Sequence, residues 1–291
     1  MGKKMKLALL FVFAGIVAAV SAWAFFFASR GGDVVVSLKL DRPLRVGMEC
    51  AFAPYNWEED KASATNVPIR NGKGVYAEGY DVQIIKRVAK NLGAEIEIHK
   101  VAWENLLPDL NSGKLDMVVS GMADTEARRK MVAFSDIYNA HPADYSIMTR
   151  KDSRYADGST LADFYNARMV GQKDSVLDAV IDQIYGVKHL PPIESIPQMF
   201  EHLEENRADG IVINTESAQA YLKEYPNMAV VQFARNEGFE PGFTGICVAV
   251  RKKDTKLLEA INMALSGIST KTRLELIDQM KAKAEKADKV M

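Results

Sequence analysis

The alternation of short apolar runs with stretches of helical spacing restricts the fold of this chain more than any other feature. Residues 44–50 form an apolar run that stops at a turn, and residues 82–92 repeat apolar side chains at helical intervals. Residues 95–101 then alternate as a strand does, and a short helix over 103–110 leads to a buried strand over 115–119. The order strand, helix, strand, helix, strand predicts a parallel sheet with helices on both faces. 

A second unit of the same kind follows, with strand-like and helix-like segments alternating over residues 168–233. A strand over 245–250 and two helices within 255–280 then return to the first unit. Residues 58–77 show no periodicity and are expected to form a loop or a loose hairpin. The elements predict an α/β protein of two lobes, one formed by residues 44–141 and 243–291 and the other by residues 142–242. The strand-end loops of two such open sheets meet at a shared crevice, where ligands bind.

Composition excludes several classes of function. The chain has 291 residues, enough for two domains, and its 37 Lys and Arg against 38 Asp and Glu give a net charge of −1, which argues against nucleic acid as a partner. The four histidines are scattered, and Cys50 and Cys247 show no metal-ligand spacing, so neither a metal site nor a cofactor is predicted. A disulfide between Cys50 and Cys247 stays open at this point.

The N-terminus carries an export signal. Lys3, Lys4 and Lys6 precede an uncharged apolar run over residues 7–28, as in a signal peptide, and the run is long enough to span a bilayer. The lysines would keep the N-terminus cytoplasmic and send the remainder outward. We expect residues 1–30 to be an uncleaved membrane anchor, with a cleaved signal peptide as the alternative, and residues 31–43 to be a linker.

Seven short stretches carry a family resemblance through their order and spacing: LRVG at 44–47, APY at 53–55, GYDV at 79–82, WENLLP at 103–108, SGKLD at 112–116, TEARR at 125–129 and FSDIY at 134–138. Residues 44–280 thereby resemble the polar amino-acid-binding proteins of ABC importers, the bacterial solute-binding family 3. The resemblance implies a two-lobed periplasmic-binding-protein-like fold of type II, each lobe a mostly parallel sheet flanked by helices.

Arg128 is the principal site residue that the resemblance implies. The arginine of the family's T-x-x-R segment binds the α-carboxylate of the ligand, and a planar guanidinium suits a carboxylate. Arg128 would lie near the turn formed by Ser120, Gly121, Met122 and Ala123, whose free N–H groups also favour an anion. A solvated surface arginine is the alternative.

Four further residues of the first lobe match positions around the ligand side chain in the family. Phe52, Tyr55 and Trp103 would provide apolar walls and cation–π contacts, with core packing as the alternative, which suits Tyr55 equally well. Glu49 matches an acidic position of basic-amino-acid binders and would pair with a ligand cation; an exposed loop acid is the alternative.

The second lobe departs from the family pattern. Asp174, Ser175 and Val176 stand where the family has a Gly-Ser/Thr turn that donates N–H groups to the ligand. Thr215 stands where the family places an aspartate for the ligand's α-amino group, and a threonine carries no counter-charge. We hypothesise that another acid pairs with a ligand amine. The candidates are Glu49, Asp174 and Glu216.

The function that follows is capture of an amino acid or related small carboxylate-bearing ligand by an extracytoplasmic, monomeric solute-binding protein that docks to an ABC permease. The lobes would close about a hinge formed near residues 138–148 and 239–243. No catalytic residue is assigned. Two alternatives stay open: a ligand-sensing module for a membrane signalling partner, and a periplasmic enzyme like cyclohexadienyl dehydratase.

Overall fold

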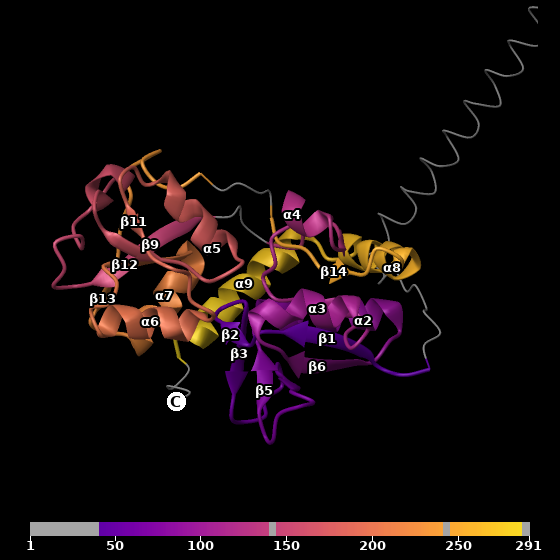
Figure 1. Cartoon of the computed structure of the whole chain (residues 1–291). Helices are drawn as coiled ribbons and strands as arrows, with labels where there is room; N and C mark the ends of the chain where they lie inside the picture. Colours follow the sequence, from indigo (N-terminus) through magenta and orange to yellow (C-terminus); the bar gives the residue numbers. More distant parts are fainter. Residues whose placement is uncertain (1–40, 140–143, 241–244, 287–291) are drawn as a thin grey trace, which may run out of the picture. The chain divides into compact units, whose positions relative to one another are not determined.

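The computed structural model describes residues 41–139, 144–240 and 245–286 (Figure 1). The predicted anchor over residues 1–30 lies outside these residues, as do most of the linker and part of both predicted hinge segments. Within the described ranges, no helix is both long and apolar enough to cross a membrane.

The first sheet has five strands in the order β6-β1-β7-β14-β8. Its strands are β1 (Leu44–Met48), β6 (Ile96–Lys100), β7 (Met117–Val118), β8 (Ala133–Phe134) and β14 (Ala249–Val250). The strands β6, β1 and β7 run parallel, as expected, whereas β14 is antiparallel to both of its neighbours. The sheet is therefore mixed, because the chain returns from the second lobe in the opposite direction.

Helices cover both faces of this sheet. On one face lie α2 (Tyr80–Leu92), α8 (Thr255–Ser266) and α9 (Thr270–Ala284), which pack on one another and contribute to a single core. The other face has its own core around the 3-10 helix η1 (Trp103–Asn105) and α3 (Leu106–Asn111). The helical spacing over residues 82–92 produces α2, which ends at Gly93 in the left-handed conformation with φ 60°.

The second sheet also has five strands, in the order β11-β10-β12-β9-β13. Its strands are β9 (Tyr145–Arg150), β10 (Arg168–Val170), β11 (Lys188–His189), β12 (Gly210–Asn214) and β13 (Met228–Val230). The strands β11, β10 and β12 are parallel, and β9 runs antiparallel to both β12 and β13. This sheet is likewise mixed, because β9 enters it from the first lobe.

Short helices enclose a separate apolar core around the second sheet. They are η2 (Leu161–Phe164), α5 (Val176–Ala179), η3 (Val180–Gln183), α6 (Ile196–Glu204) and α7 (Thr215–Glu224). The helix expected over residues 175–185 is thus one α-helical turn followed by 3-10 structure. Ser175 caps its start through a hydrogen bond from Leu177 N to the serine hydroxyl.

A small third sheet takes in residues 58–77, which were expected to form a loop or a loose hairpin, together with residues just before them. Its order is β2-β3-β5-β4, from β2 (Ala51–Phe52), β3 (Asn56–Glu59), β4 (Val67–Pro68) and β5 (Tyr76–Glu78). The strands are too short to show a period of two, so the sequence pattern gave no strand signal here. Both cysteines are buried and free, so the disulfide left open above is not formed.

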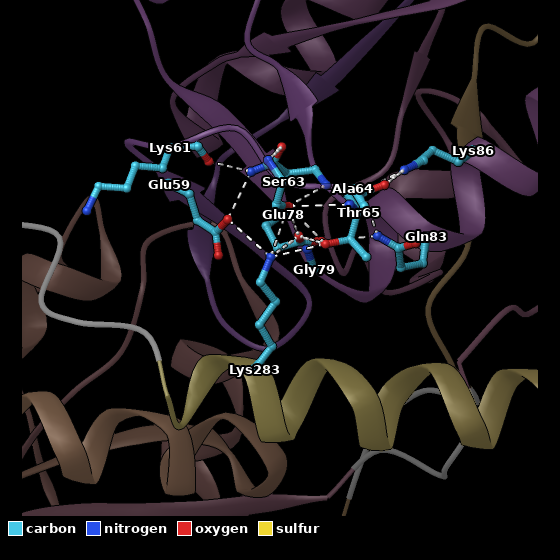
Figure 2. A network of polar contacts seen from close by, with 11 residues as sticks. Glu59, Lys61, Ser63, Ala64, Thr65, Glu78, Gly79, Gln83, Lys86 and Lys283 are labelled. Atoms are coloured by element: carbon cyan, nitrogen blue, oxygen red, sulfur yellow. Dashed lines mark hydrogen bonds and ion pairs between the residues drawn. The ribbon is translucent and has the colours of Figure 1, made fainter.

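The C-terminal helix is fastened to this small sheet by Lys283, whose ammonium lies among side-chain oxygens (Figure 2). It bonds the carboxylate of Glu78, which is 0% exposed, and lies 3.2 Å from Glu59 Oε2 and 3.1 Å from Thr65 Oγ1. Glu78 also accepts hydrogen bonds from Gly79 N and Gln83 Nε2. Burial of the Glu78 charge therefore depends on a cation supplied by the far end of the chain.

Replacing Lys283 by Met should destabilise the folded protein by about 1–3 kcal/mol, because it leaves a buried carboxylate without its cation. Lys271→Met is the matched control on the same helix. The Lys271 side chain is 86% exposed and pairs only with Glu275 at 3.8 Å, so its loss should cost less than about 0.5 kcal/mol. Urea unfolding of both variants checks this; equal midpoints would contradict it.

Candidate functional site

One cavity is lined by residues of both lobes and has a volume of about 50 Å³. Most of the predicted site residues line it: Glu49, Phe52, Tyr55, Trp103, Ser120, Gly121, Ala123, Arg128, Ser175 and Val176. The first-lobe members lie at or just after strand ends, where loops of an open α/β sheet gather. Ten of the residues that the resemblance implied therefore line the same cavity.

Arg128 is held rigidly at this cavity and is 7% exposed. It belongs to α4 (Glu126–Arg129), which Thr125 caps by accepting a hydrogen bond from Arg128 N. The guanidinium donates to Ala123 O and to Asp174 O, both at 2.9 Å, and lies over the Trp103 ring at 5.1 Å. Because burial removes water from the charge, the pKa of Arg128 falls to about 10. A guanidinium has five N–H donors, so these two bonds leave donors for an anion.

Glu49 places a carboxylate in the same cavity and is also 7% exposed. Its Oε1 accepts from Gln172 Nε2 of the second lobe at 2.7 Å, and its backbone N–H donates to Ser120 Oγ at 3.0 Å. Burial raises the pKa of Glu49 to about 7, against the lowering effect of the Gln172 hydrogen bond. A cation brought beside Glu49 would stabilise its ionised form.

Aromatic rings form part of the wall. The rings of Phe52 and Tyr55 stack with centroids 5.1 Å apart. The Tyr55 hydroxyl crosses to the second lobe and donates to Glu216 Oε2 at 2.5 Å. Trp103 Nε1 donates to Asp174 O at 3.4 Å. These rings provide the apolar area that was expected around a ligand side chain, and two of them also join the lobes.

A buried carboxylate supports the turn at the cavity. Asp81 is fully buried and accepts from Gly121 N, Asn56 Nδ2 and the Tyr138 hydroxyl, each at 2.8 Å. Burial raises the pKa of Asp81 to about 7, and its hydrogen bonds act in the opposite direction. Asp81 thus fixes the Gly121 backbone, whose φ is 58°. A Cβ at Gly121 would lie 2.8 Å from the Phe52 ring, so glycine permits the close approach.

Four predicted residues do not line the cavity. Met122 packs in the apolar core beside α3, and Thr215 places its hydroxyl 3.0 Å from that of Ser146. Glu216 faces Lys281 of α9, with Oε1 2.7 Å from the ammonium, beside the Tyr55 bond. Asp174 has an exposed side chain and contributes only its carbonyl, from a backbone with φ 56°.

Other cavity residues were not singled out from the sequence: Asn139, Tyr145, Gln172, Leu177, Ile196, Asn214, Gly245 and Ile246. Two of them could have been found from the sequence, because they stand at the ends of predicted strands. Gln172 follows the predicted strand at its carboxyl end, and Asn214 ends β12 one residue before Thr215. Asn214 lines the cavity, whereas the predicted Thr215 does not.

Among residues 41–139, 144–240 and 245–286, no group of three or more His, Cys, Asp or Glu side chains is arranged to hold a metal ion. The chemistry that this cavity offers is charge pairing and hydrogen bonding, from one buried guanidinium, one buried carboxylate and several neutral polar groups.

This chain is similar in sequence and in fold to known binding proteins. The model of the bacterial extracellular solute-binding proteins, family 3, matches residues 44–280. The arginine-binding extracellular protein ArtP of Bacillus subtilis is 28% identical over 73% of this chain and 81% of its own length. ABC transporter arginine-binding protein 1 of Escherichia coli is 29% identical over 71% of this chain and 82% of its own length. The arginine-bound form of truncated ArgBP from T. maritima has a TM-score of 0.63 at 30% identity, over 78% of this chain and 96% of that one.

The matched region runs from β1 into α9 and takes in both sheets and the cavity. The resemblance inferred from the seven sequence stretches is confirmed, and with it the two-lobed α/β fold. This chain belongs to the bacterial extracellular solute-binding proteins, family 3.

Proposed function

We propose that this protein captures an amino acid or a related small carboxylate-bearing ligand between its two lobes and delivers it to an ABC importer. The observation that carries the proposal is the single cavity in which a buried guanidinium, Arg128, and a buried carboxylate, Glu49, face space that no protein atom fills. A desolvated charge without a partner is costly, so each group favours a ligand group of opposite sign.

Arg128 is proposed to bind the ligand carboxylate. Its guanidinium is fixed by two backbone carbonyls and by the Trp103 ring, so little freedom remains to be lost when a ligand binds. These two hydrogen bonds orient the guanidinium and leave its other N–H groups for the ligand. The Ser120 hydroxyl lies in the same lining and supplies a further hydrogen-bonding group. The Gly121 N–H, expected to be free for an anion, is instead bonded to Asp81.

Capture is proposed to work by closure of the lobes about the ligand. Hydrogen bonds at or beside the cavity join the lobes, from Gln172 to Glu49, from Arg128 to Asp174 O and from the Tyr221 hydroxyl to Ala51 O at 2.8 Å. The bonds of Tyr55 and Trp103 described above cross between the lobes as well. A ligand that bridges the same surfaces would add to these contacts and stabilise the closed form. We place the lobe boundaries and the hinge within residues 138–148 and 239–243, where the chain crosses between the two sheets.

The remaining parts of the proposal concern location and partners. Residues 1–30 would hold the protein at the outer face of the cytoplasmic membrane as an uncleaved anchor, and the closed form would dock to a permease as a monomer. We propose binding without turnover. The family description, extracellular solute binding, supports the location and the binding role.

Arg128→Ala should lower affinity for a carboxylate-bearing ligand at least 100-fold, about 2.7 kcal/mol, because the carboxylate loses its charged partner. The first measurement is a thermal-shift screen with arginine, histidine, glutamine and cystine, since a bound ligand raises the melting temperature. Calorimetry with the strongest ligand follows. Arg129→Ala is the control, because that neighbour is exposed and pairs with Asp124 at 2.5 Å. Unchanged affinity in folded Arg128→Ala protein would refute the assignment.

Glu49 gives the binding a pH dependence. Only the ionised carboxylate pairs with a ligand cation, and the pKa of Glu49 in the unliganded protein is about 7. Affinity for a cation-bearing ligand should therefore fall about tenfold for each pH unit below about 7. Calorimetry across this range checks the slope, and Glu49→Gln should remove it. A slope that persists in Glu49→Gln would assign the titration to another group, of which Asp81 is the nearest in pKa.

A further inference from the structure

We propose that the cavity selects ligands with one carboxylate and only one cationic group, and that the neutral side chain of Asn214 is what excludes a second cation. This inference rests on the proposed function and narrows it to a ligand class. Basic amino acids, with two cations and one carboxylate, would be discriminated against in favour of ligands with no net charge.

The charges of the lining carry the inference. Among the described residues that line the cavity, Arg128 and Glu49 are the charged ones, and they are of opposite sign. A ligand with one anionic and one cationic group neutralises both. A second ligand cation would enter the cavity without a second carboxylate to receive it, which is the costly case for a charge removed from water.

The two other acids considered for this role are engaged elsewhere. Glu216 bonds the Tyr55 hydroxyl and lies 2.7 Å from the ammonium of Lys281, in a separate hollow between α7 and α9. Asp174 turns its carbonyl toward Arg128 and Trp103, while its side chain is exposed. Neither carboxylate lines the cavity as the structure stands.

Asn214 holds the second-lobe position at which a carboxylate would complete a site for two cations. It ends β12, opposite Tyr145 of β9, and both residues line the cavity. Its Oδ1 accepts from Glu216 N at 3.0 Å and so caps α7. The amide carries no charge, and one lone pair of its oxygen already serves the helix. An ammonium placed beside it would therefore meet a neutral dipole and no counter-charge.

The positions of the two charges also limit the ligand. Glu49 contacts Gln172, and Arg128 contacts Asp174 two residues further along the same segment. The ligand's cation and carboxylate should therefore be joined by a short chain. The uncharged remainder would lie against Phe52, Leu177 and Ile196, which provide apolar wall. Neutral amino acids, in which one carbon joins the two charged groups, fit this description.

The test compares arginine with two relatives of nearly the same shape that each lack one of its cations: citrulline, with a neutral side chain, and 5-guanidinopentanoate, without the α-amine. Calorimetry at about pH 8, where Glu49 is ionised, should show that at least one of the two binds at least about tenfold more tightly than arginine.

Asn214→Asp should then reverse the order, raising arginine affinity at least about tenfold relative to citrulline. Thr215→Asp is the matched control: it adds the same charge one residue along, outside the cavity lining, and should leave the order unchanged. Circular dichroism confirms that both variants are folded.

The outcomes separate the two proposals. If arginine binds the unaltered protein as tightly as both analogues, or if folded Asn214→Asp leaves the preference as it was, the single-cation inference is overturned while ligand capture stands. If neither arginine nor citrulline nor 5-guanidinopentanoate binds, and the amino-acid screen is also negative, the proposed function itself fails.

Discussion

The site depends on one buried guanidinium held between two carbonyl oxygens of different lobes. Arg128 takes Ala123 O from the first lobe and Asp174 O from the second, and both bonds are needed because the charge is almost removed from water. The same guanidinium stacks on the Trp103 ring and lines the cavity with N–H groups that are not used by the two carbonyls. A single side chain therefore joins the lobes, orients an aromatic wall and provides the positive end of the cavity. The other polar groups of this end of the cavity are neutral, because the fixed guanidinium already provides the positive charge.

The second lobe meets this guanidinium in an unusual way. Asp174 has φ 56°, a conformation that costs a residue with a side chain more than it costs glycine. In this conformation the Asp174 carbonyl accepts hydrogen bonds from both Arg128 and Trp103. The charge of the aspartate remains outside, so the residue acts at the cavity as a backbone group. Asn214 follows the same logic, since its amide completes a helix cap and lends the cavity polarity without charge.

The sequence was sufficient for the features that depend on local chemistry. Thr125 caps the helix that carries Arg128, and such a cap is a local feature because it needs only residues three apart. Helical spacing over residues 82–92 predicted α2. Features that depend on contacts between residues distant in sequence could not be predicted from the sequence. Strands of two to four residues such as β2 and β3 show no period, and their sheet is held partly by Lys283 from the other end of the chain. Glu216 was a reasonable candidate for the cavity until Lys281, distant in sequence, was seen to engage it. Asn214 was missed by one position, since the step from strand to helix changes which neighbour faces the crevice.

The place of β14 in the first sheet has a consequence for how the molecule is made. This strand lies between β7 and β8 and contributes residues 249 and 250, after the whole of the second sheet has been synthesised. The strand β7 also pairs with β1, but β7 and β8 do not pair with each other, so β8 joins the sheet only through β14. The second sheet, whose strands all lie between residues 145 and 230, is complete much earlier. During synthesis from the N-terminus, all strands of the second sheet are therefore present while the first sheet still lacks β14 and the helices α8 and α9. Residues 249–284 complete the lobe that residues 44–134 begin.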